Sequence, residues 1–159
     1  QPDFLNAVVA LDLPAADDPT AGALDLLVAL KRLERQSGRQ RRRRWGPREL
    51  DLDLLLYGDH RIRADRPPAA LSTSAANERG SAGGILEVPH PAMRDRLFVL
   101  APLADLAPDL RPPGWPGAVG DARDRRVAAE DPGAVVAVGS WDGASASWGP
   151  LEAGTPGPA

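Results

Sequence analysis

The chain has 159 residues, 17 of them proline and 16 glycine, and a formal net charge of −3. This length excludes two large domains, and no run in the sequence approaches the ~18 consecutive apolar residues of a membrane-spanning helix, so we expect no membrane partner. The negative net charge does not favour a surface built to bind a polyanion, and the absence of cysteine excludes disulfides and suits a reducing cytosol, so we expect a cytoplasmic protein.

The first pattern along the chain is a strand followed by a helix. Residues 4–13 alternate with a period of two, which predicts a strand. Asp18 and Pro19 mark a helix start, and leucines then recur at three- and four-residue spacing until Gly38. This spacing predicts an amphipathic helix that ends at a glycine.

A basic loop separates this helix from a second strand. Residues 39–44 are all arginine apart from Gln40, and residues 45–47 read Trp-Gly-Pro, which cannot continue a helix, so we expect an exposed loop. Residues 49–57 alternate again and predict a strand. From residue 59 to residue 84 the composition turns to Arg, Pro, Ala, Ser and Gly without a period, which predicts a long loop.

The last part of the chain has weaker patterns. Residues 85–88 predict a short extended piece, and the apolar positions between 93 and 106 predict a helical stretch interrupted at Pro102. Beyond Arg111 only residues 134–138 have the pattern of an ordered element. We therefore expect the remainder to be an irregular tail.

The second strand carries two acidic residues on one face. Leucines occupy every other position from Leu50 to Leu56 and point into a core, while Asp51 and Asp53 emerge together on the opposite face. At a separation of ~7 Å, two carboxylates repel by about 2.4 kcal/mol in a medium of effective dielectric near 20. A partly enclosed pair therefore favours a bound cation, and oxygen ligands with room for water and phosphate are how Mg²⁺ is held at nucleotide sites. On its spacing alone, the pair also fits an ordinary solvated strand face.

Basic and aromatic residues accompany this acidic pair. The arginines come just before the strand and would lie at its mouth, so guanidinium groups and a divalent cation would converge as they do at a polyphosphate site. Taken separately, the arginine run also fits a solvated loop or a nucleic-acid contact. Trp45 in this polar loop is typical of a residue that stacks on a flat partner. His90, between two prolines, is a candidate phosphate donor or an ordinary surface residue.

Motifs in a fixed order carry a resemblance to a known enzyme family. They are Gln1-Pro2-Asp3-Phe4-Leu5-Asn6-Ala7, then Arg44-Trp45-Gly46-Pro47-Arg48-Glu49-Leu50-Asp51-Leu52-Asp53, then Val88-Pro89-His90 with Met93-Arg94-Asp95-Arg96-Leu97-Phe98. Together they resemble the successive motifs of hydroxymethyldihydropterin pyrophosphokinase of folate synthesis, from Gln1 to about Pro113. The second motif is long and mixed in chemistry, which makes it specific.

The resemblance implies an α+β, ferredoxin-like fold and a diphosphate transfer from ATP to the hydroxymethyl group of 6-hydroxymethyl-7,8-dihydropterin, with release of AMP. It implies that Asp51 and Asp53 bind two Mg²⁺ ions and act in catalysis with Arg44 and Arg48. The implied ATP-binding residues are Arg41, Arg44, Trp45, Arg48, His90 and Arg96, and the implied pterin-binding residues are Phe4, Asn6, Trp45 and Phe98. Glu34 and Arg39 match positions at the end of a family helix and are expected to be structural.

The resemblance also indicates that part of the family's fold is missing. The first strand, first helix and second strand of the family would precede Gln1, so we expect an N-terminally truncated chain. Because the first strand is central in a ferredoxin-like sheet, the strands predicted at 4–13 and 49–57 would lack their shared neighbour. We therefore expect these residues alone to be poorly folded and inactive.

The same comparison predicts the organisation of the chain. Residues 1–113 would form the C-terminal two-thirds of the pyrophosphokinase domain, and residues 114–159 a mostly irregular, Pro/Gly-rich tail. A flexible insertion at 65–84 weakens the case for nucleotide contacts from Ile85 and Glu87. The expected partners are ATP and a reduced pterin, without nucleic acid. We expect a monomer that can be fused to, or in contact with, another folate-pathway enzyme.

Two other functions fit parts of the pattern. One is a non-catalytic ferredoxin-like module that binds RNA or single-stranded DNA through the arginine loop and Trp45, with a steep salt dependence and no need for Mg²⁺. The other is a degenerate homologue that binds pterin or ATP in a regulatory or assembly role.

Overall fold

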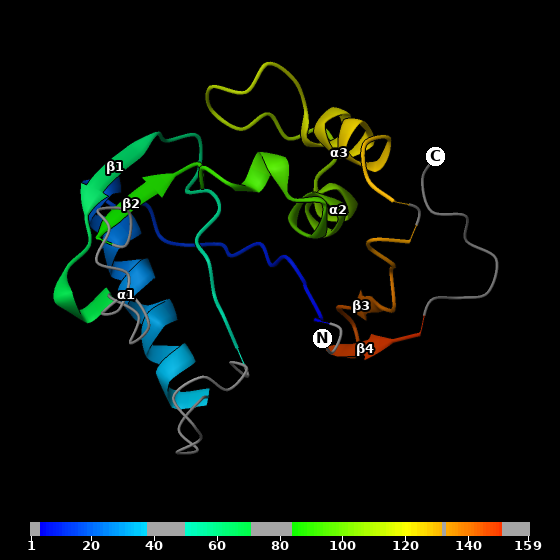
Figure 1. Ribbon diagram of the computed structural model, residues 1–159. Coiled ribbons are helices and arrows are strands. Elements are labelled where there is room, and N and C mark those ends of the chain that lie inside the picture. Colours follow the sequence, from blue (N-terminus) through cyan, green and yellow to red (C-terminus); the bar gives the residue numbers. More distant parts are fainter. Residues whose placement is uncertain (1–3, 38–49, 71–83, 132, 151–159) are drawn as a thin grey trace.

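The computed structural model describes residues 4–37, 50–70, 84–131 and 133–150 (Figure 1). These ranges contain helices and two small antiparallel sheets, an α+β composition that confirms the predicted fold class. The helices are α1 (Pro19–Ser37), α2 (Leu97–Leu106) and α3 (Val119–Val127), and the strands are β1 (Ile62–Asp65), β2 (Ile85–Val88), β3 (Ser140–Asp142) and β4 (Ser147–Gly149). Short 3₁₀ turns occur at Pro68–Ala70 and Met93–Asp95.

Helix α1 forms where the leucine spacing predicted it. The Thr20 backbone N–H donates to Asp18 Oδ1 at 2.8 Å, so the aspartate caps one of the first amide groups of the helix. Its buried face includes Leu27 and packs against the chain around Tyr57. A Cβ added at Gly22 would lie 2.3 Å from Tyr57 Oη, so glycine is what allows the tyrosine to approach the helix.

The β1–β2 hairpin lies against α1 and is only partly as predicted. The extended piece at 85–88 is confirmed as β2, which pairs antiparallel with β1 in the register Ile62↔Val88 and Ala64↔Leu86. These four residues join the cluster beneath α1. The prediction of a loop through all of 59–84 is wrong for β1, because a strand of only four residues offers too short an alternation to stand out in a polar sequence.

Helix α2 starts later than predicted and is not interrupted at Pro102. The break falls at Arg96, between the 3₁₀ turn and the helix, and Pro102 lies within α2. The proline ring removes one hydrogen bond, the one toward the carbonyl of Phe98. Because Leu100 and Leu103 are buried on either side of the proline, the packing keeps the helix continuous across the lost bond.

The region after Arg111 contains more structure than the sequence predicted. Helix α3 packs on α2 through Val119 and Ala122, and β3 and β4 form a hairpin in which Trp141 pairs with Trp148 at 5.6 Å between ring centroids. Residues 134–138, expected to be ordered, belong to no helix or strand. Their apolar alternation finds no strand partner among the described residues, so no sheet forms there. The division of the chain at residue 113 stays a prediction.

The two longer predicted strands are not formed. Residues 4–13 and 50–57 run extended without strand assignment, and the part of the predicted strand at residue 49 lies outside the described residues. Neither segment has a partner strand within the described ranges. A strand needs a neighbour to accept and donate its backbone hydrogen bonds, so an alternating pattern alone does not produce one.

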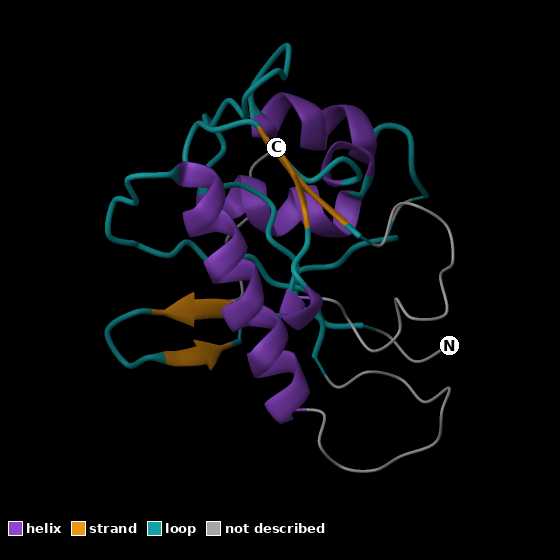
Figure 2. Cartoon of the chain, turned by 90° about the vertical axis from the view of Figure 1, so that its left-hand side faces the viewer, coloured by secondary structure: helices purple, strands orange, loops and turns teal. Residues whose placement is uncertain are grey.

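The described residues bury two apolar clusters. The segment 50–57 runs between helix α2 and the part formed by α1 and the β1–β2 hairpin (Figure 1), and the hairpin lies beside the long helix α1 (Figure 2). Leu54 belongs to the cluster of α1 and the hairpin, whereas Leu55 and Leu56 pack against the cluster of α2 and α3. Leu50 is exposed, so the prediction that every second leucine enters one core holds only for Leu54. Within the described ranges, no helix combines the length and apolar character needed to cross a membrane.

Candidate active site

Asp51 and Asp53 lie on the same side of the extended segment, as their spacing predicted. Each carboxylate approaches the ammonium group of Lys31, with Oδ1 at 3.8 Å for Asp51 and 3.9 Å for Asp53. Their side chains are 54% and 50% exposed, so both remain accessible to a ligand from solvent. The pair therefore forms one acidic face with a buried cation, Lys31, at its base.

Helix α1 holds this acidic face in place through Leu52, the residue between the two aspartates. Lys31 Nζ donates to the Leu52 carbonyl at 2.8 Å, and the Leu52 N–H donates to Glu34 Oε1 at 2.6 Å. The ammonium group also donates to Glu34 Oε1 at 2.6 Å, closing a network of three groups. Side chains from one helix thus satisfy both backbone groups of Leu52, and this fixes the direction in which its neighbours point.

His90 is joined to the same segment from the end of β2. Its backbone N–H donates to the Leu55 carbonyl at 2.8 Å, two residues beyond Asp53, and the Val88–Pro89 peptide bond that precedes it is cis. The Ala92 N–H donates to His90 Nδ1 at 3.2 Å. Because Nδ1 accepts this bond, the neutral imidazole carries its proton on Nε2, which is available as a donor.

Burial is the main cause that lowers the pKa of His90 below its ordinary value of 6.5. The Asp53 carboxylate acts in the opposite direction, and the guanidinium groups of Arg96 and Arg66 lower the pKa further. The imidazole is therefore neutral at pH 7 and lies within the electrostatic reach of one of the predicted metal-binding carboxylates.

Arg96 and Phe98 lie together at the start of α2. The Arg96 Cζ is 5.8 Å from the centroid of the Phe98 ring, and both residues are exposed, Phe98 to 41%. The structure thus brings together five of the predicted site residues, namely Asp51, Asp53, His90, Arg96 and Phe98. Their roles in binding ATP and pterin stay predictions.

Among the described residues, Phe4 and Asn6 are predicted site residues that are not brought into this group. Phe4 is 65% exposed, and the Asn6 side chain donates to the Phe4 carbonyl at 3.3 Å, a local contact on the exposed N-terminal segment. Within the described ranges, no ring contact joins Phe4 to Phe98, so the aromatic slot for pterin stays a prediction. Four predicted residues lie outside the described residues, namely Arg41, Arg44, Trp45 and Arg48.

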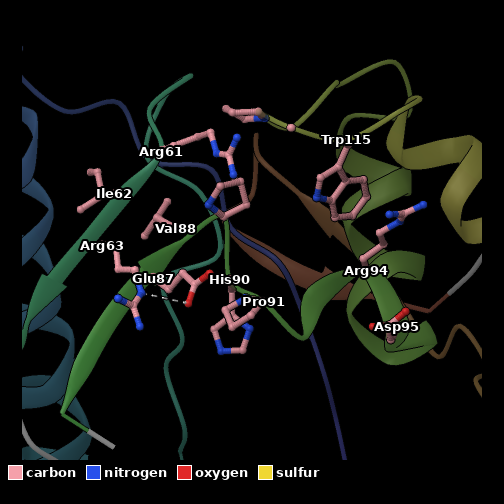
Figure 3. A pocket seen from close by; sticks show the side chains of 13 residues that line it. Arg61, Ile62, Arg63, Glu87, Val88, His90, Pro91, Arg94, Asp95 and Trp115 are labelled. Carbon is pink, nitrogen blue, oxygen red and sulfur yellow. Dashed lines mark ion pairs between the residues drawn. The ribbon is translucent and has the colours of Figure 1, made fainter. Parts of the chain in front are cut away.

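A pocket of about 450 Å³ opens beside His90, between the β1–β2 hairpin and the loop that leads to α3 (Figure 3). Arg61 lines it from the hairpin side, and Arg94 and Trp115 line it from the helical side. The Arg94 Cζ lies 5.9 Å from the centroid of the Trp115 ring. Gly114, at a φ of 81°, lets the Arg61 guanidinium pack against the loop. Because the lining also includes Arg63, Glu87 and Asp95, the pocket carries charges of both signs with an excess of arginine, and it has one aromatic wall.

The donor set is suitable for a hard divalent cation bound together with a nucleotide. The two aspartates offer carboxylate oxygens, the ligand type that Mg²⁺ prefers, and both are half exposed. No cluster of three or more His, Cys, Asp or Glu suited to a metal occurs within the described ranges. A Mg²⁺ ion here would thus need water or phosphate oxygens for its other ligands, which is its usual coordination at nucleotide sites.

Sequence reasoning missed several residues of this region. Lys31, the only lysine in the sequence, precedes Glu34 by three positions, and this i, i+3 pair was the available signal. Arg66 lies close enough to influence His90, and its buried Nε has no hydrogen-bond partner among the described residues. Arg66 had no such signal, because it falls in a stretch that reads as a loop.

Comparisons with known proteins address the family directly. The family model described as 7,8-dihydro-6-hydroxymethylpterin-pyrophosphokinase (HPPK) matches residues 1–108. The chain belongs to the HPPK family. It is 46% identical over 113 residues to the 2-amino-4-hydroxy-6-hydroxymethyldihydropteridine pyrophosphokinase of Pseudomonas aeruginosa, a match that covers 71% of this chain and 54% of the relative.

Other HPPK relatives match a similar share of this chain. The enzyme of that name from Haemophilus influenzae is 40% identical over 110 residues, which cover 69% of this chain and 53% of the relative. The mitochondrial folate synthesis bifunctional protein of Pisum sativum is 40% identical over 106 residues, which cover 67% of this chain and 16% of the relative. The chain therefore spans about half the length of its curated bacterial HPPK relatives.

Proposed function

We propose that this protein takes part in folate synthesis by transferring diphosphate from ATP to the hydroxymethyl group of 6-hydroxymethyl-7,8-dihydropterin, with release of AMP. The observation that carries the proposal is the pair Asp51 and Asp53, which face the same ammonium group, with the imidazole of His90 within the electrostatic reach of Asp53. Membership of the HPPK family supports the choice of substrates. The reaction needs no nucleophile from the protein, because the pterin hydroxyl attacks, so the protein contributes positioning and charge neutralisation.

Asp51 and Asp53 are the residues that would hold magnesium. A metal ion held there would supply the positive charge that lowers the pKa of the attacking hydroxyl and neutralises the transferred phosphates. The two aspartates supply fixed carboxylate oxygens, and Lys31 and Glu34 keep these oxygens on one side of the chain through Leu52. Holding the ligands in advance lowers the reorganisation needed when the substrates arrive.

His90 and Arg96 are the described residues placed to bind phosphate. The neutral imidazole presents Nε2–H as a donor, since Ala92 occupies Nδ1. The guanidinium group of Arg96 lies close enough to His90 to lower its pKa. Its planar set of N–H donors matches two phosphate oxygens. We propose that these two groups stabilise the charge that develops on the AMP leaving group.

The pocket beside His90 offers space for the nucleoside end of ATP. Its volume of about 450 Å³ is within the range of small-molecule sites, and the Trp115 ring provides a flat apolar wall. Arg61 and Arg94 add positive charge on two sides. We propose that the phosphates run from this pocket past His90 toward the aspartates. Phe98, at the start of α2, would then contribute to the pterin site.

The proposal is tested by a product assay with ATP, the reduced pterin and Mg²⁺, in which AMP and the diphosphorylated pterin are separated by chromatography. Because the chain spans about half of its bacterial relatives, it is assayed alone and joined to the N-terminal part of the Pseudomonas aeruginosa protein. We expect stoichiometric formation of both products by the joined protein and none after Asp53→Asn. Equal activity of the unjoined chain would refute the predicted need for a preceding segment, and undiminished activity of Asp53→Asn would refute the proposed site.

A further inference from the structure

The ammonium group of Lys31 lies close to the two acidic carboxylates, where its positive charge competes with a metal ion for them. Its ammonium group lies 3.8 Å from Asp51 Oδ1 and 3.9 Å from Asp53 Oδ1, oxygens of the two carboxylates proposed to bind magnesium. The residue is 4% exposed, and its group is anchored by Glu34 Oε1 at 2.6 Å and the Leu52 carbonyl at 2.8 Å. These contacts hold the positive charge at the base of the acidic face.

We propose that Lys31 makes metal binding depend on the nucleotide, an inference that rests on the proposed metal role of Asp51 and Asp53. In the nucleotide-free protein the ammonium group partly neutralises the two carboxylates and repels a divalent cation a few ångströms away. The phosphates of a nucleotide bring negative charge that offsets this repulsion. Divalent cations therefore enter together with the nucleotide rather than before it.

Substitution of Glu34 tests the direction of this electrostatic effect on metal affinity. It faces Lys31 at 2.6 Å and cancels part of the ammonium charge, so neutralising Glu34 increases the positive potential at the aspartates, whereas neutralising Lys31 decreases it. The two substitutions should change metal affinity in opposite directions. A purely structural role predicts the same direction for both, because either change disturbs the network around Leu52.

The experiment is a Mn²⁺ titration, without nucleotide, of this chain joined to the N-terminal part of the Pseudomonas aeruginosa protein, followed by electron paramagnetic resonance of the unbound ion. Lys31→Gln retains an amide donor for Leu52 and Glu34, and we expect it to bind Mn²⁺ at least ~10-fold more tightly than the unmodified joined protein. Glu34→Gln should bind more weakly. Arg32→Gln removes the same charge from an exposed position of the same helix and should leave the affinity unchanged. Equal or weaker binding by Lys31→Gln would overturn the proposal.

A second measurement needs no substitution at Lys31. Because this is the only lysine, labelling with ¹³C-lysine yields one set of side-chain signals. We expect these signals to move when Mg²⁺ and a non-hydrolysable ATP analogue are added together, and to move little with Mg²⁺ alone. Unchanged signals in both cases, or an equal response to Mg²⁺ alone, would contradict the inference.

Asp53→Asn separates this inference from the proposed function. If that variant keeps full nucleotide-dependent Mn²⁺ binding, the metal role of the aspartates is wrong and both proposals fail. If it loses Mn²⁺ binding while Lys31→Gln gains no affinity, only the role of Lys31 is refuted.

Discussion

The contact network around Leu52 makes Glu34 the residue whose loss should disturb the acidic face most. Glu34 Oε1 accepts from Lys31 Nζ and from the Leu52 N–H, each at 2.6 Å. Glu34→Ala leaves a buried ammonium group without its closest counter-charge and a backbone donor without a partner. Breaking a buried pair costs about 3–5 kcal/mol, and the remaining attraction of Lys31 to the aspartates reduces this, so we expect a loss of about 3 kcal/mol.

Urea unfolding followed by circular dichroism measures this loss. With a denaturant dependence of about 2 kcal/mol per molar urea, the midpoint should fall by about 1.5 M. Glu34→Gln keeps an oxygen acceptor and should lose about half as much. Glu130→Ala removes a partly exposed ion pair with Arg126 on the surface and is the control, with an expected loss below ~1 kcal/mol.

Hydrogen exchange at one amide gives the local counterpart of this prediction. The Leu52 N–H should exchange faster in Glu34→Ala, whereas the Ala107 amide, which donates to Leu103 at the end of α2, should keep its protection. An unchanged urea midpoint together with a protected Leu52 amide would refute the role assigned to Glu34.

Three further predictions follow from other contacts. Gly22→Ala places a Cβ 2.3 Å from Tyr57 Oη, and we expect urea unfolding to show a destabilisation of about 1–3 kcal/mol. Gly143→Ala is the control, because a Cβ at Gly143 would have nothing within 4 Å and should have little effect. Equal effects of the two substitutions would contradict the packing argument. The pKa of His90, measured by NMR, should lie below 6.5 because folding favours the neutral imidazole. The contribution of His90 to folding stability is therefore present above pH 6.5 and is lost as the pH falls through the pKa of the folded state. A pKa at or above 6.5 would contradict the effect of burial. Arg94→Ala should weaken binding of a non-hydrolysable ATP analogue about tenfold in calorimetry, and unchanged affinity would remove the pocket from the nucleotide site.

The sequence predicted helices better than strands, for a physical reason. Helix α1 satisfies its own backbone hydrogen bonds, so a capping residue and a repeating apolar face are sufficient to place it. The predicted strands at 4–13 and 49–57 depend on partners that no local pattern supplies. Strand β1 was missed because its four residues are specified by their pairing with β2 rather than by their own composition.

The sequence predicted those features of the candidate site that depend on residue spacing along the chain. It did not predict those that depend on packing between distant segments. A period of two was enough to place Asp51 and Asp53 on one side. The contacts of Lys31 with Leu52, 21 positions later in the chain, arise only when α1 packs against the extended segment, so the sequence pattern carries no trace of them. The arginine loop predicted to complete the site lies outside the described residues, and its role stays a prediction.

The central claim is that Asp51 and Asp53 bind metal together with a nucleotide, and one titration tests it most directly. Mn²⁺ is added to the chain joined to the N-terminal part of its Pseudomonas aeruginosa relative and to the double variant Asp51→Asn/Asp53→Asn of the same protein, each with and without a non-hydrolysable ATP analogue, and bound ion is counted by electron paramagnetic resonance. We predict nucleotide-dependent Mn²⁺ binding by the unmodified joined protein and its loss in the double variant, with the same helical circular dichroism. Equal Mn²⁺ and nucleotide binding by both proteins would contradict the claim.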